Sequence, residues 1–166
     1  LKPYGFTYDE LIDLYREFHK PKHRRSFVCE VKGVRFVNDS KATNLAAVKA
    51  AFEAEKGPIW LMTSGQMKCE SFRDLDIDLS RLKGVIAFGE SQIDACNAFC
   101  AHCTVLQAES LEEAVYLAKE SAASGQTVLF SPGGASFDLF ENYVDRGEQF
   151  EYTVSRSLLP EGASHE

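Results

Sequence analysis

A group of polar side chains follows an apolar segment at a point where a strand is expected to pass into a helix. Residues 34–37 are mostly β-branched or aromatic, as in strands, and residues 45–52 have the Ala-rich composition and spacing of a helix. The polar residues between them, in a segment called here the Lys41 turn (residues 38–44), are Asn38, Asp39, Ser40, Lys41, Thr43 and Asn44. Ligands of open α/β sheets bind where strands end, so this turn is a candidate binding site.

The chemistry predicted for the Lys41 turn is the binding of an anion. Lysine supplies a positive charge, and the first N–H groups of the following helix are unpaired and carry a partial positive charge. A purely structural alternative exists, because Asp, Ser, Thr and Asn are the preferred N-cap residues of helices. Capping explains one or two of these side chains but not the lysine, so we favour a binding site.

A second polar turn with a lysine follows the next apolar segment, residues 59–62. This Lys68 turn (residues 63–72) repeats the order of strand, polar turn and lysine. A lysine on a flexible turn is often simply solvated. In a parallel sheet, however, Lys41 and Lys68 would lie at the same edge, where two lysines predict a pocket for a carboxylate or a phosphate.

The third turn, the Ser136 turn (residues 130–140), contains Gly133 and Gly134 between a predicted strand and a predicted helix. Glycine lets the backbone come close to a ligand, and a helix beginning at Ser136 would offer N–H donors to a carboxylate. The alternative is an ordinary turn in which Ser136 caps that helix. We expect Lys41, Thr43, Lys68 and Ser136 to line one concavity.

Apolar segments alternate with helical patterns along the chain, and this alternation indicates an α/β fold. The expected architecture is a Rossmann-like, mostly parallel sheet with helices on both faces and a short N-terminal β-hairpin. Strands are expected at residues 27–31, 34–37, 59–62, 84–89, 104–106 and 127–130, and helices at 7–18, 45–55, 91–100, 111–123 and from 136 onward. Ser110 and Glu113 fit a capping box, as do Thr7 and Glu10.

Composition and charge exclude several classes of protein. The 166 residues suffice for one domain, and 45% hydrophobic with 26% charged residues is ordinary for a soluble globular protein. A net charge of −7 without a Lys/Arg stripe argues against a nucleic-acid partner. No apolar run reaches the ~18 residues of a membrane span, and no secretory signal is visible. Because the chain begins with Leu1, we expect a processed chain or a piece of a longer protein.

Five cysteines, an odd number, do not predict a disulfide framework, and reduced thiols in a reducing cytosol fit better. Cys96, Cys100, His102 and Cys103 lie close enough in sequence for a zinc site to be considered. No Cys-x-x-Cys pair accompanies them elsewhere. Free cysteine is commonly buried, so we expect core packing and no metal site.

The three turns resemble the C-terminal domain of the muramyl (Mur) ligases, which build peptidoglycan. Residues 33–44, Gly-Val-Arg-Phe-Val-Asn-Asp-Ser-Lys-Ala-Thr-Asn, are similar to the segment that opens this domain. The Ser-Lys-Ala-Thr-Asn run points to the member that adds D-glutamate, since other members have a different cluster there. The resemblance extends from about residue 23 to residue 150. From the resemblance and the residue patterns outside it, we expect an N-terminal helix and linker at 1–22, the domain at 23–158 and a disordered tail at 159–166.

The resemblance also implies roles for matched residues. Those implied to bind substrate are Lys41, Thr43, Lys68, Ser136, Phe137 and Tyr143, and those implied to bind nucleotide are Arg24, Asp39 and Lys41. In the family, the second lysine holds the D-glutamate side chain, and the serine of the third turn grips the α-carboxylate with the following backbone. An aromatic residue further along closes the pocket, and a His-Arg pair like His23-Arg24 lies against the nucleotide. Catalytic residues stay unassigned.

The Lys68 turn departs from the family pattern Gly-Gly-Asp-x-Lys-x-x-Asp-Phe. Lys68 and Phe72 match it, but Ser64, Gln66 and Ser71 replace a glycine and two aspartates. The role of the lysine is still expected. The altered neighbours leave open a ligase that adds a different amino acid.

The function implied by the resemblance is that of the substrate-binding part of an ATP-dependent, amide-forming ligase of the bacterial cytoplasm. The implied partners are D-glutamate, ATP or ADP and, through domains outside this chain, UDP-N-acetylmuramoyl-L-alanine, with ATP and Mg²⁺ held mainly by a central domain. The sequence has no Gly-x-x-x-x-Gly-Lys-[Ser/Thr] loop for a triphosphate, so the chain alone is expected to be inactive. The alternative from another class is a free-standing regulatory module that binds an amino acid or a nucleotide.

Overall fold

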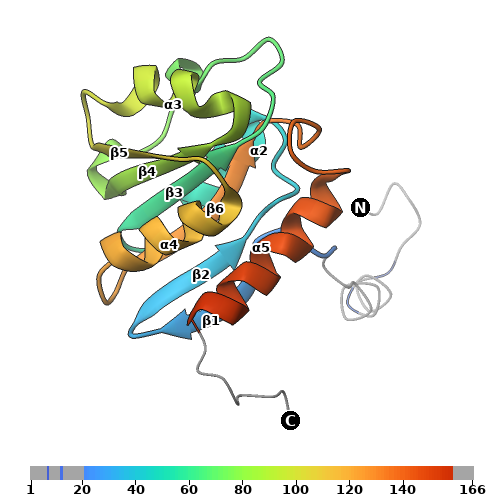
Figure 1. Cartoon of the computed structure of the whole chain (residues 1–166), viewed down its shortest axis with the longest axis vertical. Coiled ribbons are helices and arrows are strands. Elements are labelled where there is room, and N and C mark those ends of the chain that lie inside the picture. The colour runs from blue at the N-terminus through green and yellow to red at the C-terminus, as the bar shows by residue number, and fades with distance from the viewer. Residues whose placement is uncertain (1–6, 8–11, 13–20, 159–166) are drawn as a thin grey trace.

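The computed structural model describes residues 7, 12 and 21–158 of the chain (Figure 1). Most of the helix predicted at residues 7–18 and the whole tail at 159–166 therefore lie outside the described residues. No described helix is long and apolar enough to cross a membrane.

Within the described part of the chain, six strands form one sheet in the order β1-β2-β6-β3-β4-β5. β1 is antiparallel to β2, and the other neighbours pair in parallel. This mostly parallel sheet with an N-terminal hairpin agrees with the prediction. The strands are β1 (Ser26–Val31), β2 (Val34–Asn38), β3 (Ile59–Ser64), β4 (Leu82–Phe88), β5 (Thr104–Ala108) and β6 (Thr127–Gly133). The α-helices are α2 (Leu45–Ala54), α3 (Gln92–Phe99), α4 (Leu111–Ser121) and α5 (Tyr143–Leu158), and the short 3₁₀ helices are η2 (Phe72–Asp74), η3 (Leu79–Arg81) and η4 (Gly89–Ser91).

The predicted hairpin is confirmed, and its turn consists of Lys32 and Gly33. Both residues adopt the left-handed region, with φ of 52° and 77°, as a two-residue hairpin turn requires. A Cβ at Gly33 would lie 2.2 Å from Ser124 Oγ. Backbone conformation and close packing therefore both require glycine at residue 33.

Helices cover both faces of the sheet, as predicted, because alternate strand residues point to opposite sides. Trp60 of β3 packs with α4 and α5, whereas its neighbour Leu61 packs with α2 and α3. Figure 1 shows α4 and α5 across the near face of the sheet. Phe130 of β6 stacks on Phe150 of α5 with ring centroids 4.5 Å apart. This contact fixes the end of β6 relative to α5, and both elements contribute to the site described below.

The helix predicted from Ser136 onward is wrong at its start, because α5 begins only at Tyr143. The Ser136 carbonyl accepts a hydrogen bond from Phe140 N at 2.9 Å, but this turn does not continue into a helix. The Asn142 side-chain oxygen accepts from Val144 N at 2.8 Å and so caps α5. The Ser136 turn is therefore an irregular loop.

Two helix starts follow the capping rules used in the prediction. Asn44 Oδ1 accepts from Ala47 N at 2.9 Å at the start of α2, and Ser110 Oγ accepts from Glu113 N at 3.2 Å at the start of α4. The Glu113 carboxylate accepts from Glu109 N at 2.7 Å, one residue before the position expected for a capping box. Local sequence thus locates both starts correctly.

Candidate functional site

The three polar turns lie side by side at the carboxyl edge of the sheet, where the parallel strands β2, β6 and β3 end. Backbone hydrogen bonds connect them directly. Gly133 N donates to the Ala42 carbonyl at 2.9 Å, which connects the Ser136 turn to the Lys41 turn. Gln66 and Ala135 exchange backbone hydrogen bonds of 2.8 and 3.0 Å, which connects the Ser136 turn to the Lys68 turn. Segments far apart in sequence thus form one continuous surface.

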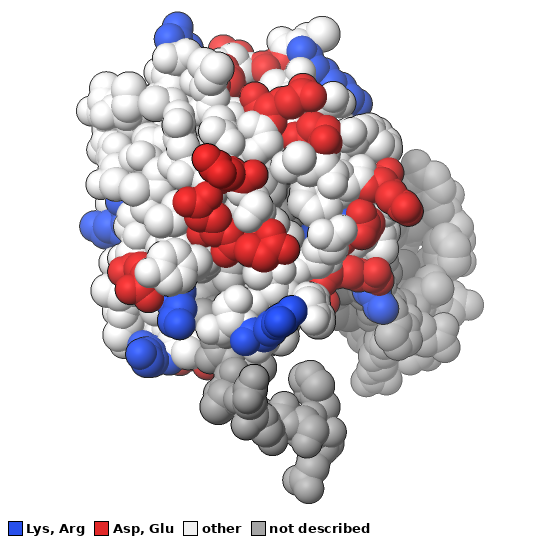
Figure 2. All heavy atoms as spheres, in the orientation of Figure 1, with Lys and Arg blue, Asp and Glu red and all other residues white. Residues whose placement is uncertain are grey.

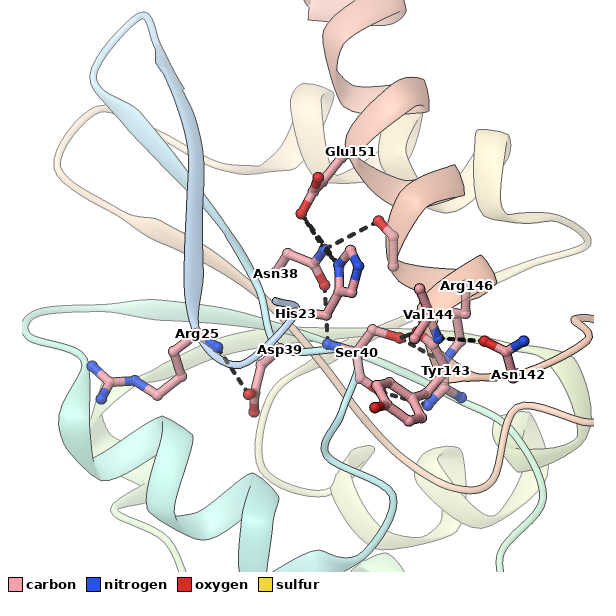
Figure 3. A network of polar contacts seen from close by, with 11 residues as sticks. His23, Arg25, Asn38, Asp39, Ser40, Asn142, Tyr143, Val144, Arg146 and Glu151 are labelled. Carbon is pink, nitrogen blue, oxygen red and sulfur yellow. Dashed lines mark hydrogen bonds and ion pairs between the residues drawn. The ribbon is translucent and has the colours of Figure 1, made fainter. Parts of the chain in front are cut away.

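Arg146 of α5 lies beneath these turns and is fully buried (Figure 3). Its Nε and Nη2 donate to Ser40 Oγ at 3.1 Å and to the Ser40 carbonyl at 2.9 Å. Its Nη1 donates to the Gly134 carbonyl at 3.1 Å. A Cβ on Gly65, in the Lys68 turn, would lie 2.9 Å from the same Nη1. Ser40 Oγ also donates to the Tyr143 carbonyl at 2.8 Å. The Arg146 guanidinium therefore contacts the Lys41 and Ser136 turns and closely approaches the Lys68 turn.

Sequence analysis did not single out Arg146, although its spacing gives a signal. Arg146, Phe150 and Val154 recur at every fourth position of α5, and the latter two lie in the core. The arginine is therefore on the buried face. Burial lowers the pKa of its guanidinium to about 10, and the charge of Asp138 opposes this shift. Arg146 keeps its positive charge at neutral pH and makes the floor of the site cationic.

His23, Asn38 and Glu151 form a second polar network behind the Lys41 turn (Figure 3). The Asn38 amide nitrogen donates to His23 Nδ1 at 2.8 Å and to Glu151 Oε1 at 2.7 Å, and its oxygen accepts from Ser40 N at 3.0 Å. The His23 carbonyl accepts from Lys41 N at 3.0 Å. His23 is almost fully buried, so it supports the Lys41 turn from the interior through these hydrogen bonds.

Replacing Gly147 by alanine tests this network. The new Cβ would lie 2.4 Å from His23 Nδ1, so we expect the free energy of unfolding to fall by about 1–3 kcal/mol through overpacking. Urea denaturation followed by circular dichroism measures the change. The matched control is Glu148→Ala at the exposed neighbouring position, for which we expect a change within about 0.5 kcal/mol. Equal stability of the two variants would contradict the packing argument.

A pocket of about 340 Å³ opens beside the Lys41 turn. Its lining combines charged residues with small ones, namely Arg24, Arg25, Asp39, Lys41, Ala42, Ala47, Ala50 and Ala51. The Asp39 carboxylate accepts from Arg25 N at 3.0 Å and from Ser131 Oγ at 2.9 Å. A lining of small side chains and basic side chains suits a flat ring that carries anionic groups.

Lys41 also lies next to Tyr143. Its Nζ is 5.5 Å from the centroid of the Tyr143 ring, within the range of a cation–π contact. Lys41 lines the 340 Å³ pocket, and Tyr143 begins α5 on the other side of the turn. The lysine therefore lines the pocket with Arg24 and Asp39 and also contacts Tyr143, one of the residues implied to bind substrate.

The departures in the Lys68 turn form hydrogen bonds with acidic residues of the next segment. Gln66 Nε2 donates to Glu90 Oε1 at 3.0 Å, and Ser71 Oγ donates to Asp94 Oδ1 at 2.6 Å. Where the family pattern has two aspartates, this chain has two hydrogen-bond donors that each contact a neighbouring carboxylate. Lys68 itself is exposed, so its ammonium is accessible to a ligand.

The remaining predicted substrate residues differ in exposure. Thr43 and Tyr143 are partly buried, and Ser136 is almost fully buried. Phe137 is 70% exposed, so its ring is accessible at the carboxyl edge while its backbone continues the Ser136 turn.

The expectation of open helix starts at the site is wrong in two places. No helix begins at Ser136, as described above. At α2, the first N–H group, that of Leu45, donates to Glu70 Oε2 at 3.0 Å, and Ala47 N is capped by Asn44. The anion at the start of α2 is a side chain of the protein itself, so anionic ligands have to be bound by lysines, hydroxyls and the N–H groups of the turns.

Among the residues that the structure describes, no cluster of three or more His, Cys, Asp or Glu side chains could hold a metal ion. Of the cysteines considered for zinc, Cys103 packs against the core on the α2 and α3 side, and burial raises the pKa of its thiol. Cys100 is exposed, so core packing was a wrong expectation for that residue.

On the face shown in Figure 2, acidic side chains predominate and no basic stripe is visible.

Comparisons with known proteins bear on the family and the fold of the chain. No family model matches the chain. A UDP-N-acetylmuramoylalanine–D-glutamate ligase from Pelodictyon phaeoclathratiforme is 43% identical over 151 residues, which cover 90% of this chain and 32% of that ligase. The corresponding ligase from Chlorobium luteolum is 43% identical over 148 residues, covering 88% and 32%. The solved structure of UDP-N-acetylmuramate–alanine ligase from Thermotoga maritima matches with a TM-score of 0.59 at 13% identity, covering 94% of this chain and 35% of that one.

The chain thus spans about a third of the length of these relatives. The structural match extends over nearly all of this chain and shows a common fold, while the sequence identity to the two D-glutamate ligases shows common descent. The chain is therefore a Mur ligase C-terminal domain, homologous to the UDP-N-acetylmuramoylalanine–D-glutamate ligases.

Proposed function

We propose that this domain binds D-glutamate and presents it to an ATP-dependent ligase reaction that extends UDP-N-acetylmuramoyl-L-alanine. The observation that carries the proposal is the meeting of three polar turns at one edge of the sheet above the buried Arg146. Two of these turns bring lysines, and the third brings a serine and backbone N–H groups. The names of the relatives support the choice of substrate.

The chemistry of D-glutamate fits these groups. The ligand has two carboxylates and one ammonium group, so its pocket needs two separate anion sites and an open face for the amine. Lys68 and Thr43 bind the side-chain carboxylate in our proposal, and Ser136 with Phe137 N binds the α-carboxylate. Tyr143 covers the pocket.

In the proposed reaction, ATP phosphorylates the L-alanyl carboxylate. The amine of D-glutamate then attacks the acyl phosphate, which forms the amide and releases phosphate, with ADP as the other product. This chain would contribute by holding the amine in place, since a bound nucleophile turns a bimolecular encounter into a local one. The ammonium group of D-glutamate has to lose a proton before it attacks, and the proposal assigns this proton transfer to no residue of this chain.

The pocket beside the Lys41 turn is the proposed contact with the nucleotide. Arg24 and Lys41 supply positive charge to its lining, and the small alanine side chains leave room for a flat ring. Asp39 is fixed by two hydrogen bonds and lines the same pocket. The chain has no triphosphate loop, and its described residues include no metal-binding cluster, so we assign the main ATP and Mg²⁺ contacts to residues outside this chain.

The purified chain is expected to show no ligase activity. It supplies the pocket for the amine but lacks a triphosphate loop to activate the acid. A phosphate-release assay with ATP, D-glutamate and UDP-N-acetylmuramoyl-L-alanine should stay at the level of a no-enzyme control. Turnover that depends on all three substrates would contradict this division of roles.

A further inference from the structure

The Lys68 turn is connected to α2 by the side chain of Glu70. Its Oε2 accepts from Leu45 N at 3.0 Å, and Leu45 is the first residue of α2. A carboxylate is stabilised at a helix N-terminus both by the hydrogen bond and by the helix dipole. Glu70 lies two positions after Lys68, and Leu45 lies two positions after Thr43. The contact therefore joins the two segments that carry the proposed ligands of the side-chain carboxylate.

The other hydrogen bonds of the Lys68 turn go in different directions. At residue 66 the turn is hydrogen-bonded to Ala135 and Glu90, and at residue 71 it is hydrogen-bonded to Asp94. Among the hydrogen bonds of the described residues, the bond from Glu70 is the one that joins the turn to α2. Glu70 therefore adds a direct hydrogen bond between the turn and α2 to the packing of Phe72 against α2 in the core.

We propose that Glu70 is a positioning residue, which holds Lys68 beside Thr43 so that both reach one carboxylate of the bound amino acid. This inference rests on the proposed function of Lys68 and Thr43. A free carboxylate this close to an anion site would repel the ligand. The hydrogen bond from Leu45 N stabilises the negative charge of Glu70 and holds its carboxylate at the start of α2, where it does not compete with the ligand.

Three variants of the chain separate this role from general effects of charge. Glu70→Ala removes the bond, whereas Glu70→Gln retains an acceptor for Leu45 N without the charge. Asp76→Asn is the matched control, because Asp76 lines the same small surface pocket as Glu70 and Leu45 but pairs with Lys49 instead. Each variant is labelled with ¹⁵N for nuclear magnetic resonance.

The first readout is the backbone order of the turn without ligand. In Glu70→Ala we expect the heteronuclear NOE of Lys68 to fall and hydrogen exchange at Leu45 N to speed up about 3- to 10-fold. Glu70→Gln should lie between this variant and the wild type, and Asp76→Asn should match the wild type. Unchanged order of Lys68 in Glu70→Ala would overturn the proposal, whatever the ligand does.

The second readout is D-glutamate affinity, measured by titration of the same samples. We expect Glu70→Ala to bind about 3- to 10-fold more weakly, Glu70→Gln to recover part of the loss, and Asp76→Asn to bind as the wild type does. If Lys68→Met weakens binding but Glu70→Ala does not, the positioning role is wrong and the proposed function stands. If Lys68→Met has no effect, the proposed function itself fails, and the positioning of Lys68 beside Thr43 for a ligand fails with it.

Discussion

Replacing Arg146 by methionine is expected to lower the free energy of unfolding by about 3–5 kcal/mol. The substitution removes three hydrogen bonds to Ser40 and Gly134, and a buried acceptor left unpaired costs about 1–3 kcal/mol. The packing of the side chain is largely preserved, because methionine is flexible and similar in length. Urea denaturation followed by circular dichroism gives the difference.

The matched control is Arg156→Met, an exposed position in the last turn of the same helix. We expect it to cost less than about 1 kcal/mol. Arg146→Lys should fall between the two, because one ammonium group cannot reproduce the fork of the guanidinium. If Arg146→Met unfolded at the same urea concentration as Arg156→Met, Arg146 would not hold the turns together.

Replacing Lys68 by methionine is expected to weaken D-glutamate binding about 10- to 150-fold, or ~1.5–3 kcal/mol, if a charge-assisted hydrogen bond to the ligand is lost. Binding of ADP should change little, since the proposed nucleotide pocket is lined by residues of the Lys41 turn and α2 and not by Lys68. Isothermal titration calorimetry with each ligand measures both affinities.

Lys83→Met is the control for this experiment. Lys83 is exposed near the amino end of β4, at the edge of the sheet opposite to the three turns. Its loss removes the same charge without touching the site, so both affinities should stay within about twofold of the wild type. An equal loss of D-glutamate binding in both variants would indicate a general charge effect and remove Lys68 from the site.

The strands and most helices could be predicted because their signals are local. Apolar segments bounded by turn residues give the positions of strands, and Ser110 and Asn44 mark helix starts through their own side chains. β3 is longer than predicted because Thr63 and Ser64, both polar, are also buried in it. Pairing of Ser64 with β6 is a tertiary contact, and the local pattern does not report it.

The site could be predicted only in part for the same reason. Parallel topology predicts that lysines after two strands share one edge, and the structure has the turns of Lys41 and Lys68 there. The helix predicted at Ser136 is wrong at its start, since Asn142 caps α5. Phe140 instead packs edge-on against Phe88, with centroids 6.5 Å apart, and a local pattern does not report such a tertiary contact. Glu70 reaches the start of α2 across 25 residues of sequence, and no local pattern predicts such a contact.

Amide shift mapping tests the central claim most directly. A ¹⁵N-labelled sample of the chain is titrated with D-glutamate and, separately, with L-glutamate. We predict that D-glutamate shifts the amide signals of the Lys41, Lys68 and Ser136 turns, and that L-glutamate produces much smaller shifts at the same concentration. Shifts confined to other parts of the fold, or equal responses to the two enantiomers, would contradict a D-glutamate site at the carboxyl edge of this sheet.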